Sequence, residues 1–350
     1  MNPAIVGFET PMKQISSKLE KIHVVFTPYD MADSYNRHVG AAITSLLENC
    51  TMPVVIHIMY DANLNMDTDS YEENKCCYLS FQEKYDVEIL LHHVEIPAWY
   101  HSLRGSKILS VGTYYRLFIP DVLPDISKVI YLDGDVIVTM DLKEFWDIDI
   151  SNAPLAARVD PMFQEGMKEK PKSFIPVYEK FNFTKDDLLR YFNAGILYLN
   201  LDYIRSTMNL SETGGDYLHT NLTTPRADQD ALNFLFKDTV QLLPDRYNLF
   251  AYEAGENVPS ACNHYVTRKP WKVYKESIDA EYWKYLFLSP WCKDVSDFVG
   301  YMSIVGNVSP ISMSSSMDAV PIIQLTKWLF VYYYKRILRT VHNIIEFRWK

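Results

Sequence analysis

Apolar positions follow two different periods over the first hundred residues. Short apolar runs predict strands over 22–26, 52–59 and 87–94, and apolar residues at helical spacing predict helices over 35–47 and 71–85. This alternation of strands and helices is typical of an α/β fold with an open, mostly parallel sheet. Ligands in such sheets bind at the carboxyl ends of the strands, so the segments that follow the strands are candidate binding segments.

The same patterns continue less regularly towards residue 250. The predicted strands are 128–132, 155–160, 191–200 and 242–247, and the predicted helices are 107–117 and 142–147. Another helix is expected to begin at Asp228, where two acids flank Gln229. Acidic side chains at the start of a helix interact favourably with the helix dipole. The Asp-Gln-Asp triplet can therefore serve to stabilise the helix as well as to perform a function. Residues 161–190 are charged and interrupted by proline, which predicts an irregular loop over the site.

Two acids interrupt the most apolar stretch of the chain, 129–138. Asp133 and Asp135 stand on either side of Gly134, and an unpaired carboxylate is costly to bury. In an extended chain these two side chains point to the same side, about 6–7 Å apart, where a divalent cation satisfies both. Asp-Gly between apolar runs is also a strong hairpin signal. The continuous apolar flanks favour a strand buried on both faces, but the local string leaves both interpretations open.

Composition excludes some classes of function. The 350 residues are 48% hydrophobic and 14% aromatic, which supports a large core. The net charge of −10 argues against a nucleic-acid partner, since nucleic-acid binding requires a basic surface. The five cysteines are odd in number and include no Cys-x-x-Cys pair. We therefore expect no disulfide framework and a cytoplasmic location.

The chain is expected to contain four segments. Residues 1–20 are expected to form a leader, 21–275 the main α/β domain, 276–310 a C-terminal extension and 311–350 a linker followed by a helix. The leader lacks the apolar core of a signal peptide, and no run of eighteen apolar residues occurs. Residues 321–350 are aromatic and basic, with six Lys or Arg against the single acid Glu346. This composition predicts a helix that contacts the inner face of the membrane peripherally. The same composition suits a helix that packs against the protein, and both interpretations remain open.

Several motifs in a fixed order resemble glycosyltransferase family 8 between residues 22 and 271. They are Val24-Val-Phe-Thr27 with Tyr35, Tyr114-Tyr-Arg-Leu117, Tyr131-Leu-Asp-Gly-Asp-Val136, Phe192-Asn-Ala-Gly195, Asp228-Gln-Asp230, His264-Tyr265 and Lys269-Pro-Trp271. Each motif is weak or moderate alone, and the order makes the set specific. The resemblance implies a GT-A fold, which is a Rossmann-like α/β sheet flanked by helices. It also implies a retaining, metal-dependent enzyme that uses a sugar nucleotide.

The resemblance also implies roles for individual residues. Asp133, Asp135 and His264 are the expected ligands of Mn²⁺ or Mg²⁺, a set that suits a hard cation. Catalytic roles fall to Gln229 at the reactive face of the sugar, Asp228 at its hydroxyls and Asp160 near the acceptor. The expected nucleotide- and sugar-binding residues are Thr27, Tyr29, Asp30, Tyr35, Arg116, Gly134, Asn193, Ala194 and Lys269. Gly134 is expected to leave clearance beside the nucleotide.

One departure concerns the loop expected to wrap the diphosphate. The family often has His-x-x-Gly-x-x-Lys-Pro-Trp, whereas the run from His264 to Lys269 is one residue shorter and has Thr267 at the glycine position. The expected function is transfer of glucose or galactose from a UDP-hexose to a glycan or glycolipid acceptor, as in lipopolysaccharide synthesis. The alternatives are a nucleotidyltransferase and a non-catalytic glycan- or partner-binding module on the same fold.

Overall fold

The computed structural model describes residues 5–8, 20–103, 111–255, 258–272 and 277–293. The expected linker and helix at 311–350, with the segment proposed to contact a membrane, lie outside the described residues. Within the described part of the chain, no helix is both long and apolar enough to cross a membrane.

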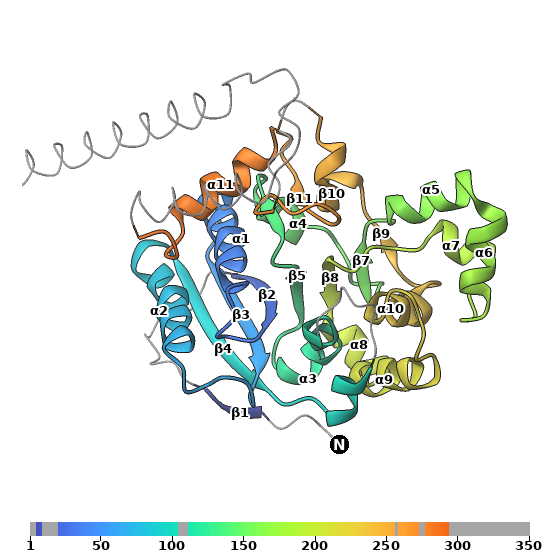
Figure 1. Ribbon diagram of the computed structural model, residues 1–350, viewed down its shortest axis with the longest axis horizontal. Coiled ribbons are helices and arrows are strands. Elements are labelled where there is room, and N and C mark those ends of the chain that lie inside the picture. The colour runs from blue at the N-terminus through green and yellow to red at the C-terminus, as the bar shows by residue number, and fades with distance from the viewer. Residues whose placement is uncertain (1–4, 9–19, 104–110, 256–257, 273–276, 294–350) are drawn as a thin grey trace, which may run out of the picture.

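Eight strands form the main sheet, in the order β1-β4-β3-β2-β5-β8-β7-β9 (Figure 1). Their bounds are β1 Ile5–Phe8, β2 Ile22–Tyr29, β3 Val54–Asp61, β4 Val87–Val94, β5 Lys128–Leu132, β7 Leu155–Ala157, β8 Ile196–Asn200 and β9 Gln241–Leu242. Strands β4, β3, β2 and β5 are parallel, as expected for an α/β sheet, while β1 and β8 run antiparallel to their neighbours β4 and β5. The expected leader therefore contributes a strand at one edge of the sheet.

A second, three-stranded sheet has the order β10-β11-β6 and was not predicted. Its strands are β6 Val136–Val138, β10 Leu249–Phe250 and β11 Cys262–His264. Because β6 pairs with β11 and not with β5, the hairpin interpretation of Asp133–Asp135 is wrong. The acid pair is instead a turn that carries the chain from one sheet to the other, and so it is not extended.

Helices cover both faces of the main sheet. The α-helices are α1 Asn36–Asn49, α2 Asp69–Lys84, α3 Ile119–Val122, α4 Leu142–Trp146, α5 Pro161–Glu169, α6 Pro171–Glu179, α7 Lys185–Leu189, α8 Leu201–Thr207, α9 Leu210–Thr220, α10 Asp228–Phe236 and α11 Asp279–Leu288. The 3₁₀-helices are η1 Ala98–Ser102, η2 Val111–Phe118, η3 Asp245–Asn248 and η4 Ala251–Glu253.

Alternate strand residues contribute to two separate cores. Val24 and Ile56 pack with α1, α2 and α4, whereas Val25 and Tyr131 pack with η2 and α8–α10. Side chains of successive strand residues point to opposite faces, so a strand covered on both faces reads as a continuous apolar run. This explains why the sequence pattern located the central strands β2–β5.

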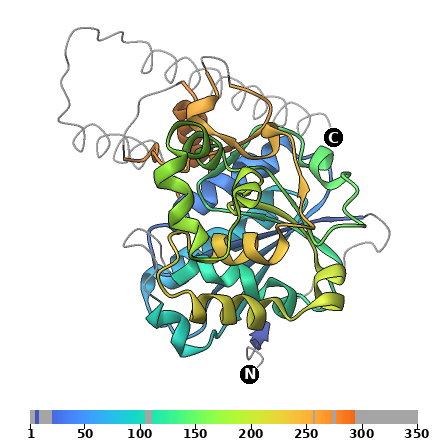
Figure 2. The same ribbon diagram turned by 90° about the vertical axis from the view of Figure 1, so that its right-hand side faces the viewer.

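Three predicted elements differ from the observed ones. The segment 161–190 is not irregular, because it contains α5, α6 and α7, which face the viewer in Figure 2. The described part of the expected helix 107–117 is 3₁₀ rather than α. Of the expected strand 242–247, only Leu242 belongs to a strand, the two-residue β9 that pairs with β7, and η3 follows.

Candidate active site

The acid pair and His264 meet because two strands pair across 130 residues of chain. His264 is the last residue of β11, and it lies opposite Val136 of β6, the residue directly after Asp135. The amide of Tyr265 donates to the carbonyl of Asp135 at 3.0 Å, and the amide of Asp133 donates to Gly195 O at 2.8 Å. The main chain therefore holds both acids beside the end of β11.

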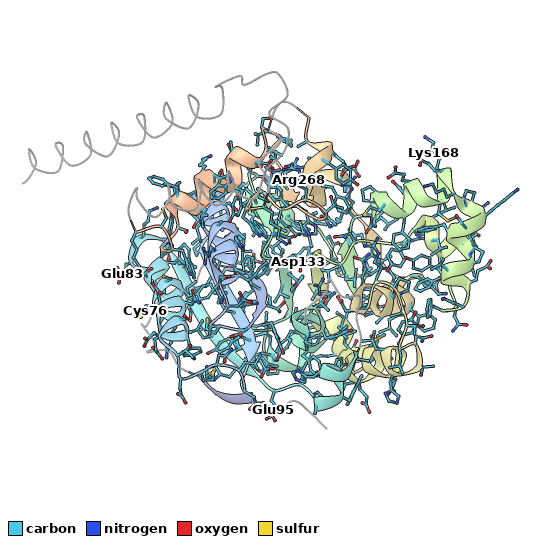
Figure 3. The ribbon with its side chains drawn as sticks, in the orientation of Figure 1. Cys76, Glu83, Glu95, Asp133, Lys168 and Arg268 are labelled. Atoms are coloured by element: carbon cyan, nitrogen blue, oxygen red, sulfur yellow. The ribbon has the colours of Figure 1, made fainter. Side chains whose placement is uncertain are left out.

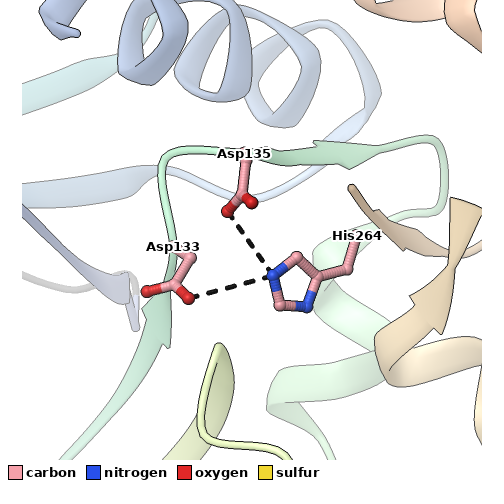
Figure 4. A group of neighbouring side chains, drawn as sticks. All are labelled: Asp133, Asp135 and His264. Atoms are coloured by element: carbon pink, nitrogen blue, oxygen red, sulfur yellow. Dashed lines mark ion pairs between the residues drawn. The ribbon is translucent and has the colours of Figure 1, made fainter. Parts of the chain in front are cut away.

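Three side chains at this junction converge on one point (Figure 4). Nε2 of His264 lies 3.8 Å from Oδ2 of Asp133 and 3.4 Å from Oδ1 of Asp135. One oxygen or nitrogen from each residue lies within 4.8 Å of the others. Two carboxylates and an imidazole at this spacing form a donor set that fits a hard divalent cation.

Asn248 fixes the orientation of His264. Nδ2 of Asn248 donates to Oδ1 of Asn193 at 2.9 Å. Oδ1 of Asn248 therefore faces Nδ1 of His264, also at 2.9 Å. Nδ1 of His264 is therefore the protonated nitrogen, and the lone pair of Nε2 points towards the acids. A carbonyl oxygen behind a metal-binding imidazole commonly fixes the tautomer in this way.

Lys269 counterbalances Asp135 at the floor of the site. Its Nζ contacts Oδ2 of Asp135 and donates to Tyr265 O at 2.6 Å. Burial alone raises the pKa of Asp135, but the charge of Lys269 and the His264 imidazole outweigh burial and hold that pKa well below its ordinary value. Asp135 is therefore ionised throughout the physiological range.

Arg116 joins Asp133 to Asp228. Its Nη2 lies 3.1 Å from Oδ1 of Asp133, and its Nε lies 3.0 Å from Oδ2 of Asp228. The guanidinium lies over the ring of Tyr131, 4.6 Å from its centroid, and the Tyr131 hydroxyl donates to Oδ1 of Asp133 at 2.6 Å. Burial raises the pKa of Asp228 to about 6, although Arg116 opposes that shift. Arg116 is thus a buried positioning residue for the acids around it.

Gln229, Asn193 and Asp160 form one hydrogen-bonded group. Oε1 of Gln229 accepts from the amide of Ala194 at 3.0 Å and from Nδ2 of Asn193 at 3.3 Å. Nε2 of Gln229 donates to Oδ2 of Asp160 at 3.3 Å, and the other oxygen of Asp160 caps α5 through the amide of Met162. Gln229 and Asn193 line a cavity that Asp133, Asp135 and His264 also line, whereas Asp160 and Ala194 lie behind Gln229 and Asn193.

The predicted nucleotide-binding residues divide into two groups. Thr27, Tyr29 and Tyr35 line the cavity. Asp30 is not among the lining residues. Its carboxylate instead accepts hydrogen bonds from the amide of Ala32 at 2.8 Å and from Nδ2 of Asn65 at 2.9 Å.

Gly134 is required by close packing. A Cβ at this position would lie 2.7 Å from Cγ2 of Val39 and 2.8 Å from Cε1 of Tyr35. Gly134 also lines the cavity, but these contacts show that the space beside it is already filled by the side chains of Val39 and Tyr35.

The cavity has a volume of about 1010 Å³, and Asp133, Asp135 and His264 all line it. In Figure 3, Asp133 lies near the centre of the molecule, between the α1 side and the α10 side. A space of this size is large enough for a small-molecule ligand, and the charged side chains that line it suit a polar or charged one.

A family model covers most of this architecture. The model for "Glycosyl transferase family 8" matches residues 27–274, which include the triad, Arg116, Gln229 and Lys269. The chain belongs to glycosyl transferase family 8. This confirms the family predicted from the ordered motifs.

Individual relatives agree with the family assignment. General stress protein A of Bacillus subtilis is 27% identical over 74% of this chain and 92% of its own length. Lipopolysaccharide 1,3-galactosyltransferase of Salmonella typhimurium is 24% identical over 66% of this chain and 68% of its own. The chain spans less of other relatives, such as 60% of a putative glycosyltransferase of Haemophilus influenzae.

Solved structures show the same fold. The galactosyltransferase LgtC, in complex with donor and acceptor sugar analogs, matches with a TM-score of 0.57 and 21% identity, over 83% of this chain and 98% of LgtC. The apo structure of the bifunctional glycosyltransferase WbbM matches with a TM-score of 0.61 and 18% identity, over 84% and 53%. The GT-A fold is thereby confirmed.

Sequence reasoning missed residues that hold the site together. Asn248 belongs to η3 and carries no local signal, because its role depends on the pairing of β10 with β11. The sequence indicates Gly195 only as the last residue of the motif Phe192-Asn-Ala-Gly195. A Cβ on Gly195 would lie 2.2 Å from Cε1 of His264 and 2.7 Å from Oδ2 of Asp133, so the glycine makes room for the triad.

Proposed function

We propose that this family 8 glycosyltransferase moves glucose or galactose from a UDP-hexose to a hydroxyl of a glycan or lipopolysaccharide-type acceptor, with retention of anomeric configuration and with Mn²⁺ or Mg²⁺. The observation that carries the proposal is the triad of Asp133, Asp135 and His264, with Nε2 of His264 held towards the acids by Asn248. When bound, a divalent cation supplies positive charge against the diphosphate leaving group.

The protein's own residues have separate tasks in this proposal. Lys269 comes from the loop after β11, lines the cavity beside Asp135 and places a compact cation where the diphosphate leaves. Thr27 and Tyr29 at the end of β2, and Tyr35 directly before α1, line the cavity where the base and ribose are expected. Arg116 lies between Asp133 and Asp228 and contacts both carboxylates, and Asp228 with Asn193 presents acceptors and donors to the sugar hydroxyls.

The surroundings of Gln229 favour a role in orientation and charge stabilisation. Its Oε1 already accepts two hydrogen bonds, from Ala194 N and Asn193 Nδ2. An amide oxygen is a weak nucleophile, and these bonds reduce its availability further. The proposed route is therefore attack by the acceptor hydroxyl on the face that the diphosphate leaves, with the proton passing to the departing phosphate. Asp160 anchors Gln229 from behind through a hydrogen bond of 3.3 Å.

Two alternatives receive less support. Membership of glycosyl transferase family 8 weighs against a nucleotidyltransferase. A non-catalytic binding module would be free to lose a member of the triad, and all three members are present and convergent.

The test measures binding and turnover separately. UDP binding is measured by calorimetry with Mn²⁺ and with EDTA, and UDP release is measured from UDP-glucose and UDP-galactose. The expected result is Mn²⁺-dependent binding and release, with Asp135→Asn and His264→Ala each losing at least about 100-fold in activity, as expected for lost metal ligands. Metal-independent UDP binding, or full activity in either variant, refutes the proposed metal site.

A further inference from the structure

Two cations that line the cavity have no carboxylate partner among the described residues, and only one of the two, Arg226, is half-buried. Five cationic side chains line the cavity: Arg116, Arg226, Arg268, Lys269 and Lys272. Three of them contact carboxylates, since Arg116 lies beside Asp133, Arg268 beside Asp279 and Lys269 beside Asp135. Lys272 is exposed, whereas Arg226 is half-buried. Among the described residues, no carboxylate oxygen lies within 4.0 Å of a side-chain nitrogen of Arg226.

The main chain around Arg226 is held in an unusual conformation. Ala227 has φ of 49° and ψ of −121°, a region that a residue with a side chain rarely adopts. The amide of Arg226 donates to Oδ2 of Asp230 at 2.7 Å, and the same oxygen accepts from Oγ1 of Thr224 at 2.6 Å. Asp230 is buried, and its other oxygen accepts from the Tyr191 hydroxyl at 2.5 Å. The turn is therefore fixed from inside the protein, and Arg226 precedes Asp228 and Gln229 at the cavity wall.

The guanidinium of Arg226 retains unused donors. Among the described residues, it faces the ring of Phe163, whose centroid lies 5.9 Å from Cζ, and the nearest hydroxyl that acts on it is that of Tyr178. A guanidinium has five N–H donors in a planar fork, and a single phenol oxygen leaves most of them unsatisfied. Asp160 acts on Arg226 only through its charge, and its oxygens are engaged by Asn193, Gln229 and the amide of Met162.

We propose that Arg226 determines substrate specificity by binding an oxyanion, a carboxylate or a phosphate, on one of the two sugars that meet beside Gln229. This inference rests on the proposed glycosyltransferase function. An oxyanion on the acceptor would narrow the acceptor to an acidic sugar, and an oxyanion on the donor would replace glucose or galactose by an acidic hexose. The planar fork of an arginine matches an oxyanion with two parallel hydrogen bonds, and a half-buried guanidinium gains most from a partner of opposite charge. The donor diphosphate is already provided for by the triad and Lys269, which lie on other elements.

The experiment compares matched neutral and anionic ligands by calorimetry, with Mn²⁺ present. The donor arm uses UDP-glucose against UDP-glucuronic acid. The acceptor arm uses methyl glucoside against methyl glucuronide and glucose 6-phosphate, each with UDP bound. We expect the anionic member of one arm to bind about ten-fold or more tightly, as a charge-assisted hydrogen bond predicts. The arm that shows the preference assigns the oxyanion to the donor or to the acceptor.

Three variants separate recognition from packing. Arg226→Met should abolish the preference, and Arg226→Lys should retain only part of it, because a point charge lacks the fork. Tyr178→Phe removes the hydroxyl beside Arg226 but leaves the guanidinium, so the preference should persist. Equal binding in both arms, or a preference that survives Arg226→Met, overturns the inference while Mn²⁺-dependent UDP binding still supports the proposed function. Loss of Mn²⁺-dependent UDP binding in the unmodified protein overturns both.

Discussion

Asn248 is the residue on which the direction of the His264 lone pair depends. Replacing it by Ala removes the oxygen that holds Nδ1 at 2.9 Å, so the imidazole is free to rotate and to change tautomer. We expect Asn248→Ala to weaken Mn²⁺ binding about 10- to 100-fold, the usual effect of losing a partner behind a metal ligand. Calorimetry with Mn²⁺ and UDP measures this change.

The control for that variant is Asn221→Ala. Asn221 donates to Tyr217 O at the end of α9 and does not line the cavity, so its loss should leave Mn²⁺ affinity unchanged. Equal Mn²⁺ affinities for Asn248→Ala and the unmodified protein would show that Asn248 does not hold the imidazole.

Gly195 is expected to tolerate no side chain. In Gly195→Ala the new Cβ would lie 2.2 Å from Cε1 of His264, and overpacking of this kind commonly costs about 1–3 kcal/mol. Part of that strain is relieved by moving His264 away from the acids, so we expect the Mn²⁺-induced rise in Tm to disappear. The matched control is Gly214→Ala, whose Cβ would approach Leu117 no closer than 3.3 Å. A normal Mn²⁺ response in Gly195→Ala would contradict the close approach of His264.

The site was predictable from sequence only where a residue carries its own signal. Asp133 and Asp135 are conspicuous, since carboxylates interrupt an apolar run, whereas His264 and Gln229 were found only through the order of family motifs. Asn248 had no signal, because its position follows from strand pairing between distant segments.

At the scale of elements, the sequence predicts helices and strands correctly where buried positions recur with the regular spacing of a helix or a strand. The central strands are apolar on both faces and were located within a few residues. The segment 161–190 is helical rather than irregular because two of its prolines begin helices instead of ending them. Pro161 and Pro171 stand at the first position of α5 and α6, where the missing N–H costs nothing. The second sheet escaped prediction because its strands have only two or three residues.

Helix α11 supports the loop that carries Lys269. The Tyr282 hydroxyl lies 2.6 Å from Nδ1 of His38, and the His38 ring stacks on Trp271 with centroids 3.8 Å apart. Trp271 is two residues beyond Lys269, so α11 and α1 together fix the end of this loop. Burial, the largest cause, lowers the pKa of His38 to about 3, and the imidazole is neutral at physiological pH.

We expect His38→Ala to raise the KM for the UDP-sugar more than it lowers kcat. Losing the stacking partner of Trp271 removes about 0.5–1.5 kcal/mol of loop-ordering energy, which corresponds to roughly 2- to 10-fold in affinity. Steady-state kinetics of UDP release measures the two constants. Tyr282→Phe keeps the aromatic packing and should have a smaller effect. A lower Tm with unchanged KM would mean that the stack stabilises the fold without positioning the loop.

At the scale of the whole molecule, three histidines cross the main sheet from β2 to β4. Nδ1 of His23 lies 3.0 Å from Nε2 of His57, and Nδ1 of His57 lies 3.0 Å from Nε2 of His92. Burial is the main cause that lowers the pKa of all three, for His92 from 6.5 to about 4. The folded chain thus keeps a neutral row of imidazoles on three neighbouring strands, one of which, β2, also lines the cavity through Thr27 and Tyr29.

This row predicts a loss of stability on the acid side. The unfolded histidines bind protons near pH 6.5 and the folded ones resist protonation, so the unfolded state holds more protons below that pH. The contribution of the neutral histidines to the free energy of unfolding is fully present above pH 6.5. It falls as the pH drops through 6.5 towards 4, by up to about 1.4 kcal/mol per pH unit for each histidine. Urea unfolding at several pH values between 7.5 and 5 measures the slope.

His57→Leu should lower stability at pH 7.5, because it breaks both hydrogen bonds, yet its slope should be shallower by about one proton. His219→Gln, a change at an exposed histidine on α9, should leave the slope as it is. An unchanged slope in His57→Leu would mean that the buried row does not set the acid limit of this fold.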